Sequence, residues 1–395
     1  MRQRSIRFIS AAFIVIVGHC LIVAILVFGV TNKSVAQRDF ISYWAAGRQL
    51  VNGSNPYDIQ AVQNLERDTG GEDNQPLLVM RNPPITFFLV APLGRVTPKT
   101  GLILWLLILL SCLSVSIWLL WRLNGHPENR FHLMAYAFAP ALACIMAGQV
   151  GIFLLLGMVL FLYFHQSRPY FAGAALLLCA IKPHLFFAFG IVLLLWMISR
   201  TSYRILVGFS IALLGSCALA FYMDPHAWSQ YSQMMHAGGA LTERVPVLSV
   251  AFRSLMDRDA VWLQFVPAAI AGVWVIWYFW AHRTHWSWMD QGMLVLIVSA
   301  MCTPFGWFTD ESMLLPAVLA GVYRAAESGR SLIPIGLIAG VALVEVLVPV
   351  QITSPFYIWT TPAWLAWYLY ATRKNLEPAV DSGPRTVTAD DGRAC

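Results

Sequence analysis

Charged residues are scarce in this sequence. Only 12% of the 395 residues are Asp, Glu, Lys or Arg, whereas 58% are hydrophobic. One soluble core of this size does not bury so much apolar surface. The composition therefore excludes an ordinary soluble protein and predicts an all-α polytopic membrane protein.

Long basic segments are also lacking beyond residues 1–7. The net charge of +6 comes from Lys and Arg residues spread over many short loops, so it does not predict nucleic-acid binding. Basic residues placed in this way determine membrane orientation, because Lys and Arg are retained on the cytoplasmic side.

Cysteine patterns typical of a disulfide framework or a metal site are missing as well. Of the seven cysteines, six lie inside apolar segments at unrelated spacings: Cys20, Cys112, Cys144, Cys179, Cys217 and Cys302. Metal sites and disulfide scaffolds place cysteines at short, regular spacings. The cysteines therefore indicate neither a disulfide framework nor a metal site.

The first apolar segment follows Arg2, Arg4 and Arg7 and extends from Phe8 to Val30. It is longer than the apolar part of a signal peptide, which has about 7 to 15 residues. We expect an uncleaved first transmembrane helix, with cleavage after Ala36 as the alternative.

The rest of the chain contains enough apolar runs for about twelve transmembrane helices in total. The later runs are Leu102–Trp121, Leu133–Ala147, Ile152–Phe164, Phe171–Ile181, Leu185–Ile198, Ile205–Tyr222, Val261–Ala281, Met293–Cys302, Met313–Tyr323, Ile333–Val350 and Phe356–Ala371. Several are shorter than the usual span of about 20 residues. Residues 170–199 form either one long helix or two helices that meet at Lys182-Pro183.

With two helices there, every short arginine-bearing loop and both termini are cytoplasmic. We expect one membrane domain over residues 1–375, with extracytoplasmic loops at 31–100 and 224–258 and a disordered cytoplasmic tail at 376–395. The unusual polar clusters then all face the outer side. Because transporters place ionisable groups near the midplane and are often built from repeats, which this sequence lacks, a transporter or flippase is only the alternative.

A short polar segment after the first apolar run is the strongest candidate for chemistry. Its apolar residues recur at helical spacing: Phe40, Tyr43, Trp44, Gly47, Leu50 and Val51. They predict a helix that starts at Asp39 and lies in the membrane interface. Asp39 is either the cap of this helix or a functional carboxylate, which Arg38 would keep ionised.

Lys182 is the other notable charge, because it lies between two short apolar runs and precedes Pro183 and His184. An ammonium at such a position favours an anionic partner such as a lipid phosphate, and the alternative is a lysine that extends to the headgroups. Gly148-Gln149 suits either a ligand contact or helix packing.

Three acidic residues lie late in the chain. Asp310 and Glu311 precede a predicted helix, where they either serve chemistry or favour the helix dipole. Glu345 lies inside an apolar run and is either paired with an outer cation or neutral.

Several short motifs resemble those of one family, glycosyltransferase family 87. They are Asp39-Phe40, Tyr43-Trp44-Ala45-Ala46, Gly53-Ser54-Asn55-Pro56-Tyr57-Asp58, Asn82-Pro83-Pro84, Gly148-Gln149, Lys182-Pro183 and Pro304-Phe305 followed by Thr309-Asp310. Two positions depart from the family pattern, since Asn82 stands where an aromatic is usual and Thr309 replaces a tyrosine. The resemblance implies the GT-C architecture and a polyprenyl-phosphate sugar, typically of mannose, as donor.

The resemblance and the positions together predict a role for each polar residue. Asp39 is expected to be the catalytic base. The expected ligands of the donor phosphate are Lys182, Arg38, Arg81 and His184, and those of the sugar or acceptor are Tyr43, Trp44, Tyr57, Asp58, Gln149 and Asp310. We expect no metal and no cofactor, because a phosphate leaving group is already anionic.

The predicted activity is transfer of a hexose, with inversion, to a lipid or glycan hydroxyl on the outer face of a bacterial inner membrane. Such a reaction requires a base for the acceptor hydroxyl, cations for the departing phosphate and an apolar groove for the prenyl chain.

The orientation is tested by placing single cysteines at Asn55 and Ser328 in a variant without native cysteines. A membrane-impermeant thiol reagent applied to intact cells should label the cysteine at position 55 and not the one at 328. Labelling of position 328 alone would contradict the predicted topology.

Overall fold

The computed structural model describes residues 29, 31–70, 78–237, 243, 245–348 and 355–373. Every regular element in these ranges is helical, which confirms the all-α prediction. The predicted first transmembrane helix, apart from residue 29, and the predicted tail at 376–395 lie outside the described residues.

The α-helices are α2 (Asn32–Ala36), α3 (Phe40–Val51), α4 (Ile59–Asp68), α5 (Phe87–Val90), α6 (Pro98–Leu123), α7 (Ala139–Ala147), α8 (Gly151–Phe164), α9 (Pro169–Ala175), α10 (Phe187–Ser199), α11 (Tyr203–Met223), α12 (Ala227–Ala237), α13 (Leu248–Met256), α14 (Val266–His282), α15 (Gln291–Met301), α16 (Leu315–Glu327), α17 (Ile333–Leu347) and α18 (Thr360–Thr372). Short 3₁₀ turns connect them: η1 (Pro84–Thr86), η2 (Leu93–Arg95), η3 (Phe131–Ala137), η4 (Cys179–Ile181), η5 (Pro183–Phe186), η7 (Val261–Phe265), η8 (Arg283–His285), η9 (Phe308–Leu314) and η10 (Pro355–Trp359).

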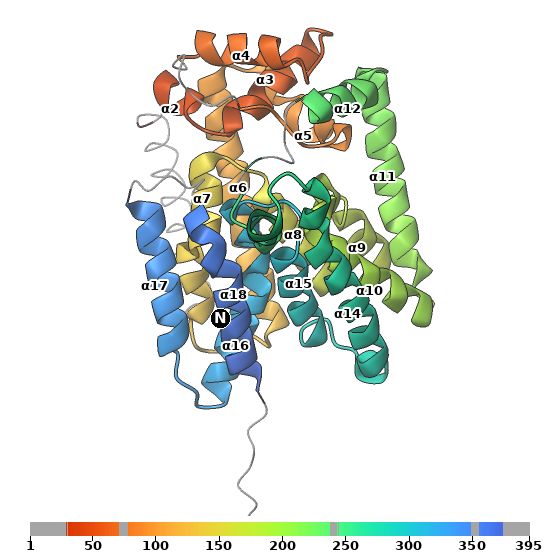
Figure 1. The fold of residues 1–395 in the computed structure, drawn as a ribbon, viewed down its shortest axis with the longest axis vertical. Coiled ribbons are helices and arrows are strands. Elements are labelled where there is room, and N and C mark those ends of the chain that lie inside the picture. The colour runs from red at the N-terminus through yellow and green to blue at the C-terminus, as the bar shows by residue number, and fades with distance from the viewer. Residues whose placement is uncertain are drawn as a thin grey trace, which may run out of the picture.

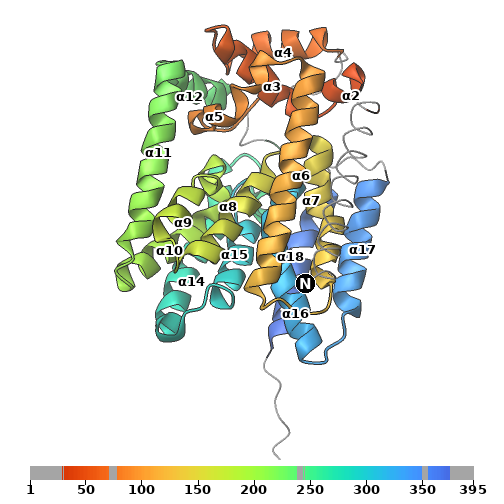
Figure 2. The same ribbon diagram turned by 180° about the vertical axis from the view of Figure 1, so that it is seen from behind.

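The helices form two layers. Helices α2 to α5 and α12 make a cap at one end of the molecule, and the remaining helices make the body beneath it (Figure 1). Helix α6 extends from the cap through the body, and α11 rises along one edge to α12 (Figure 2). The predicted outer loop 31–100 therefore forms most of the cap.

Three helical segments in the described part of the chain are long and apolar enough to cross a membrane. They are Pro98–Leu123, Tyr203–Met223 and Val261–His285. Five shorter apolar helices accompany them: Gly151–Phe164, Pro169–Ile181, Pro183–Ser199, Gln291–Met301 and Ile333–Leu347. These helices support a membrane protein, and the count of twelve spans stays a prediction.

Residues 170–199 form two helices rather than one. Helix α9 ends at Ala175, and α10 begins at Phe187. Between them Lys182 adopts φ −135° and ψ 72°, and Pro183 begins the next 3₁₀ turn. Proline lacks the N–H that a continuous helix needs, so the break leaves Lys182 at a helix junction.

Helix α3 lies inside the cap instead of on its surface. Nine of its residues are buried, so protein covers most of the apolar side that we expected to face headgroups. A Cβ on Gly47 would lie 2.1 Å from the Val90 carbonyl oxygen, and one on Gly94 would lie 2.1 Å from the Gly47 oxygen. Glycines at both positions thus allow α3 to lie directly against α5 and η2.

Helices α9 and α11 also cross at very short range. A Cβ on Gly173 would lie 2.0 Å from the Ile205 carbonyl oxygen, and one on Gly208 would lie 2.0 Å from that of Tyr170. Small residues permit such a crossing, which is common between membrane helices. The crossing attaches α11 to the segment that leads to Lys182.

The Gly173→Ala variant should destabilise this crossing, because the added methyl group forces two backbones apart. Overpacking of this kind costs about 1 to 3 kcal/mol. Gly190→Ala is the matched control, since nothing lies within 4 Å of a Cβ there. We expect a lower melting temperature in detergent for Gly173→Ala only, and equal melting temperatures would contradict the close crossing.

Candidate active site

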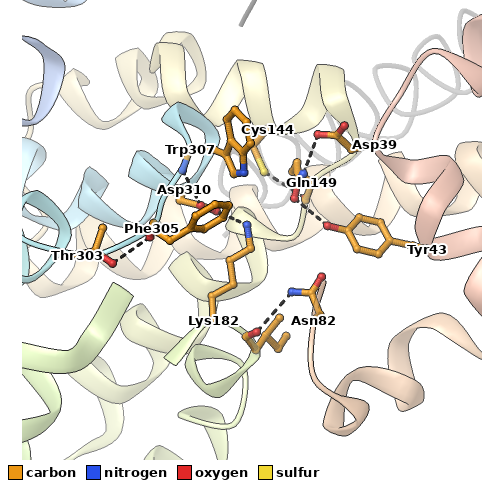
Figure 3. A network of polar contacts seen from close by, with 11 residues as sticks. Asp39, Tyr43, Asn82, Cys144, Gln149, Lys182, Thr303, Phe305, Trp307 and Asp310 are labelled. Atoms are coloured by element: carbon orange, nitrogen blue, oxygen red, sulfur yellow. Dashed lines mark hydrogen bonds and ion pairs between the residues drawn. The ribbon is translucent and has the colours of Figure 1, made fainter. Parts of the chain in front are cut away.

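Asp39 lies at the N-terminus of α3, but its side chain makes no capping hydrogen bond. Instead, Oδ2 accepts a hydrogen bond of 2.7 Å from Nε2 of Gln149 (Figure 3). In the first turn of the helix, the backbone N–H and the hydroxyl of Ser42 both donate hydrogen bonds to the Asp39 carbonyl oxygen. The capping alternative therefore does not describe this carboxylate, which connects the cap to the body.

Gln149 uses both ends of its amide. Its Nε2 donates to Asp39, and its Oε1 accepts a 2.7 Å hydrogen bond from the Tyr43 hydroxyl. The two bonds determine which end of the amide faces the carboxylate. Asp39 and Tyr43 are one turn apart on α3, so a single residue of the body contacts both.

The turn that presents Gln149 depends on Gly148. This glycine ends α7 in the left-handed region with φ of 71°, which is rarely adopted by residues with a Cβ. A Cβ there would also lie 2.7 Å from Cβ of Phe40. The Trp105 indole donates a 2.7 Å hydrogen bond to the Gly148 carbonyl, so α6 holds the turn from the other side.

Lys182 and Asp310 form an ion pair with 2.7 Å between Nζ and Oδ1. The lysine side chain is 12% exposed and that of the aspartate 3%, so the lysine does not extend to lipid headgroups. The second carboxylate oxygen accepts a 3.0 Å bond from the Trp307 backbone N–H. An ammonium has three donors, and Asp310 occupies one of them.

The two polar pairs face a common region. In Figure 3 the side chains of Lys182, Gln149, Tyr43 and Asn82 converge from separate segments of the chain. Asn82 is buried and donates through Nδ2 to the Ile181 carbonyl at 3.4 Å. The site thus contains a carboxylate on the cap side, a cation on the body side, and neutral polar groups around them.

Burial raises the pKa of Asp39 above its ordinary value, while the Gln149 hydrogen bond and the Lys182 charge act in the opposite direction. Arg38 does not supply the expected stabilising charge, because its guanidinium donates to the carbonyls of Ser34 and Met146. The cation that acts on Asp39 therefore comes from the body of the protein.

Three of the predicted sugar-binding residues form hydrogen bonds with the protein backbone. The Asp58 side chain caps α4 by accepting from the Ala61 backbone N–H at 3.0 Å. The Tyr57 hydroxyl donates to the Asn82 carbonyl at 2.9 Å, and the Trp44 indole donates to the Val96 carbonyl at 3.0 Å. Tyr57 thus contacts the backbone of a site residue, whereas Trp44 points toward η2.

Of the two remaining candidates for binding the donor phosphate, one already has an ionic partner and the other has an unpaired ring nitrogen. Arg81 forms an ion pair with Glu243 of the second outer loop. His184 packs edge-on against Phe305, and its Nε2 is buried with no hydrogen-bond partner in the described part of the chain. His184 therefore remains available to a ligand next to Lys182.

Two other carboxylates have roles in packing. Thr360 and Trp364 donate to the two oxygens of the buried Glu311 at 2.6 and 2.9 Å, which ties α18 to η9. The Glu345 carboxylate lies near the Trp359 side chain. Glu311 thereby supports the segment that presents Asp310.

The polar cluster contains no metal site within the described ranges. Over the described ranges, no three His, Cys, Asp or Glu side chains are grouped as metal ligands. An Asp-x-Asp triplet occurs at Asp257–Asp259, where it forms an exposed turn after α13 with Asp257 accepting from the Asp259 backbone. A cavity of about 470 Å³ lies elsewhere and is lined by Trp44, Leu65, Asp68, Thr69, Thr97, Pro98 and Lys99.

Sequence reasoning missed two residues of this region. Trp105 holds the Gly148 turn, but it lies in an apolar run of α6 that gives no polar signal. Glu66 is a buried carboxylate on α4, and the sequence predicted its segment as part of the outer loop at 31–100 with interfacial helices, without marking this residue. Its position in the buried helical series Val62, Glu66 and Thr69 is the one signal that could have identified it.

The fold and site define a helical membrane protein with one carboxylate and one paired cation facing a shared polar region. The family model for glycosyltransferase family 87 matches residues 81–304, more than half of the chain. The protein belongs to this family and is a glycosyltransferase. No match was found among curated proteins or among solved structures.

The Lys182–Asp310 pair is tested by a double-mutant cycle on stability. Lys182→Met and Asp310→Asn should each destabilise the protein, because removal of one partner leaves the other buried without compensation, at about 3 to 5 kcal/mol. The double variant should lose less than the sum of the two single losses. Melting temperatures that fall additively would show that the two residues do not interact.

Proposed function

We propose that this glycosyltransferase transfers a hexose, in the first place mannose, from a polyprenyl phosphate to an acceptor hydroxyl on the outer face of the membrane. The observation that supports this most is the arrangement of Asp39, without a capping role, and Lys182 around one polar region. The acceptor is a lipid or glycan.

Asp39 acts as the general base in this proposal. Its carboxylate is oriented by the amide of Gln149, which is itself held by Tyr43. Burial raises its pKa, which makes the carboxylate a better proton acceptor than an exposed aspartate. One oxygen accepts from Gln149, and the other is left for the acceptor hydroxyl.

Lys182 binds the phosphate of the donor. Two of its three N–H groups are not used by Asp310, and its charge lies where the leaving oxygen becomes more negative. His184 is the second phosphate ligand, since its buried Nε2 has no partner in the described ranges. With base and cation on different sides of the sugar, attack opposite the phosphate gives inversion. A departing phosphate stabilised in this way requires no divalent metal.

The Asp39→Asn variant should insert and fold normally but retain at most about 1% of transfer, because loss of a general base typically costs about 100-fold to 10,000-fold. The amide keeps the size of the side chain and accepts one hydrogen bond. Transfer is measured with purified protein and labelled polyprenyl-phosphomannose.

Asp68→Asn is the matched control, since this exposed aspartate undergoes the same chemical change on a neighbouring helix. It should retain normal transfer. If Asp39→Asn kept more than half of the activity, Asp39 would not be the base.

Lys182→Met should raise the donor KM and lower kcat, because the cation interacts with charge that grows on the leaving oxygen. Asp310→Asn also breaks the ion pair but keeps the cation, so comparison with it separates loss of the pair from loss of the charge. We expect the loss of kcat/KM to be at least tenfold greater for Lys182→Met than for Asp310→Asn. Unchanged kinetics would remove Lys182 from donor binding.

A further inference from the structure

Helix α4, which packs on α3, contains a second buried carboxylate. The chain turns back through residues 52–58, and α4 lies over α3 in both views (Figures 1 and 2). On α4 the buried residues Val62, Glu66 and Thr69 share one side, while Arg67 and Asp68 are exposed. Glu66 thus points into the protein from the helix that covers α3.

The Glu66 side chain is buried, and the residue is only 8% exposed. The Leu78 backbone lies close enough to lower the pKa of its carboxyl, in opposition to burial. Oε1 has no hydrogen-bond partner in the described part of the chain. Buried carboxylate oxygens are nearly always hydrogen-bonded, so an unpaired one indicates a missing ligand.

Electrostatics agree with a position near Asp39. Burial, with a smaller contribution from the Asp39 charge, raises the pKa of Glu66 to about 7. Charges affect one another in this way only over short separations. This agrees with the placement of Glu66 on α4 and Asp39 at the start of α3, two neighbouring helices of the cap.

We propose that Glu66 is an acceptor-binding residue, whose Oε1 accepts a hydrogen bond from a hydroxyl of the acceptor, which is a sugar or another polyol. This inference rests on the proposed function. It assigns Glu66 to the acceptor because Asp39, the base for the acceptor, lies on the cap side with Glu66. The phosphate-binding residues Lys182 and His184 come from the body.

The test measures transfer from labelled polyprenyl-phosphomannose to a total glycolipid extract. The extract comes from a strain that lacks the gene for this protein, in which the unmodified acceptor is expected to accumulate. Glu66→Gln keeps the shape of the side chain but removes its negative charge and replaces one acceptor oxygen by an NH2 donor. It should require about tenfold more extract for half-maximal rate, the effect expected for one lost hydrogen bond to a charged group. The donor KM should stay within twofold of the wild type.

Glu66→Leu is the second variant, because an apolar side chain of similar size removes the cost of burying a carboxylate and should fold. It should also require more extract for half-maximal rate, with an unchanged donor KM. Glu128→Gln, the same change at an exposed position, is the control and should behave as wild type. Unchanged acceptor dependence in both Glu66 variants, or equal losses for donor and acceptor, would overturn the inference. If the wild type forms no glycoside, the proposed function fails first, and this inference fails with it.

Discussion

Burying a charge or polar group without a partner costs free energy, and that cost determines how the site is built. Lys182 is held by Asp310, whose other oxygen is bound by the Trp307 backbone. Asp39 is held by Gln149, and Gln149 by Tyr43. Lys182 and Asp39 thus each have one partner in the protein and capacity left for a second, as the proposed reaction requires.

The helix breaks supply these partners. Gly148 ends α7 in a left-handed conformation and turns Gln149 toward the cap. Pro183 separates α9 from α10 and leaves Lys182 at the junction. The breaks free backbone and side-chain polar groups from the regular helix pattern, so the helix ends and the polar site occur together. The glycines at positions 47 and 94 fix the cap over this region by allowing α3 to approach η2.

Much of this architecture was predictable from the sequence. The apolar runs predicted an all-helical protein, the spacing from Phe40 predicted α3 within one residue, and the resemblance identified the family that the comparison shows. The prediction that the apolar side of α3 faces the membrane interface was wrong, because amphipathic spacing does not distinguish a membrane surface from a protein surface. The prediction that Arg38 keeps Asp39 ionised was wrong, because the two side chains point to different sides at the start of the helix. Tertiary partners such as Trp105, Glu66 and the Lys182–Asp310 pair leave no local pattern, so they required the structure.

The central claim is that the sugar leaves its phosphate in this site rather than crossing the membrane attached to it. Purified protein in vesicles is given polyprenyl-phosphomannose labelled on both the sugar and the prenyl chain, together with deletion-strain glycolipid. We predict that free polyprenyl phosphate and a new mannoside appear in a ratio of one to one. Movement of intact doubly labelled donor to the other leaflet, without either product, would contradict the account and favour a transporter.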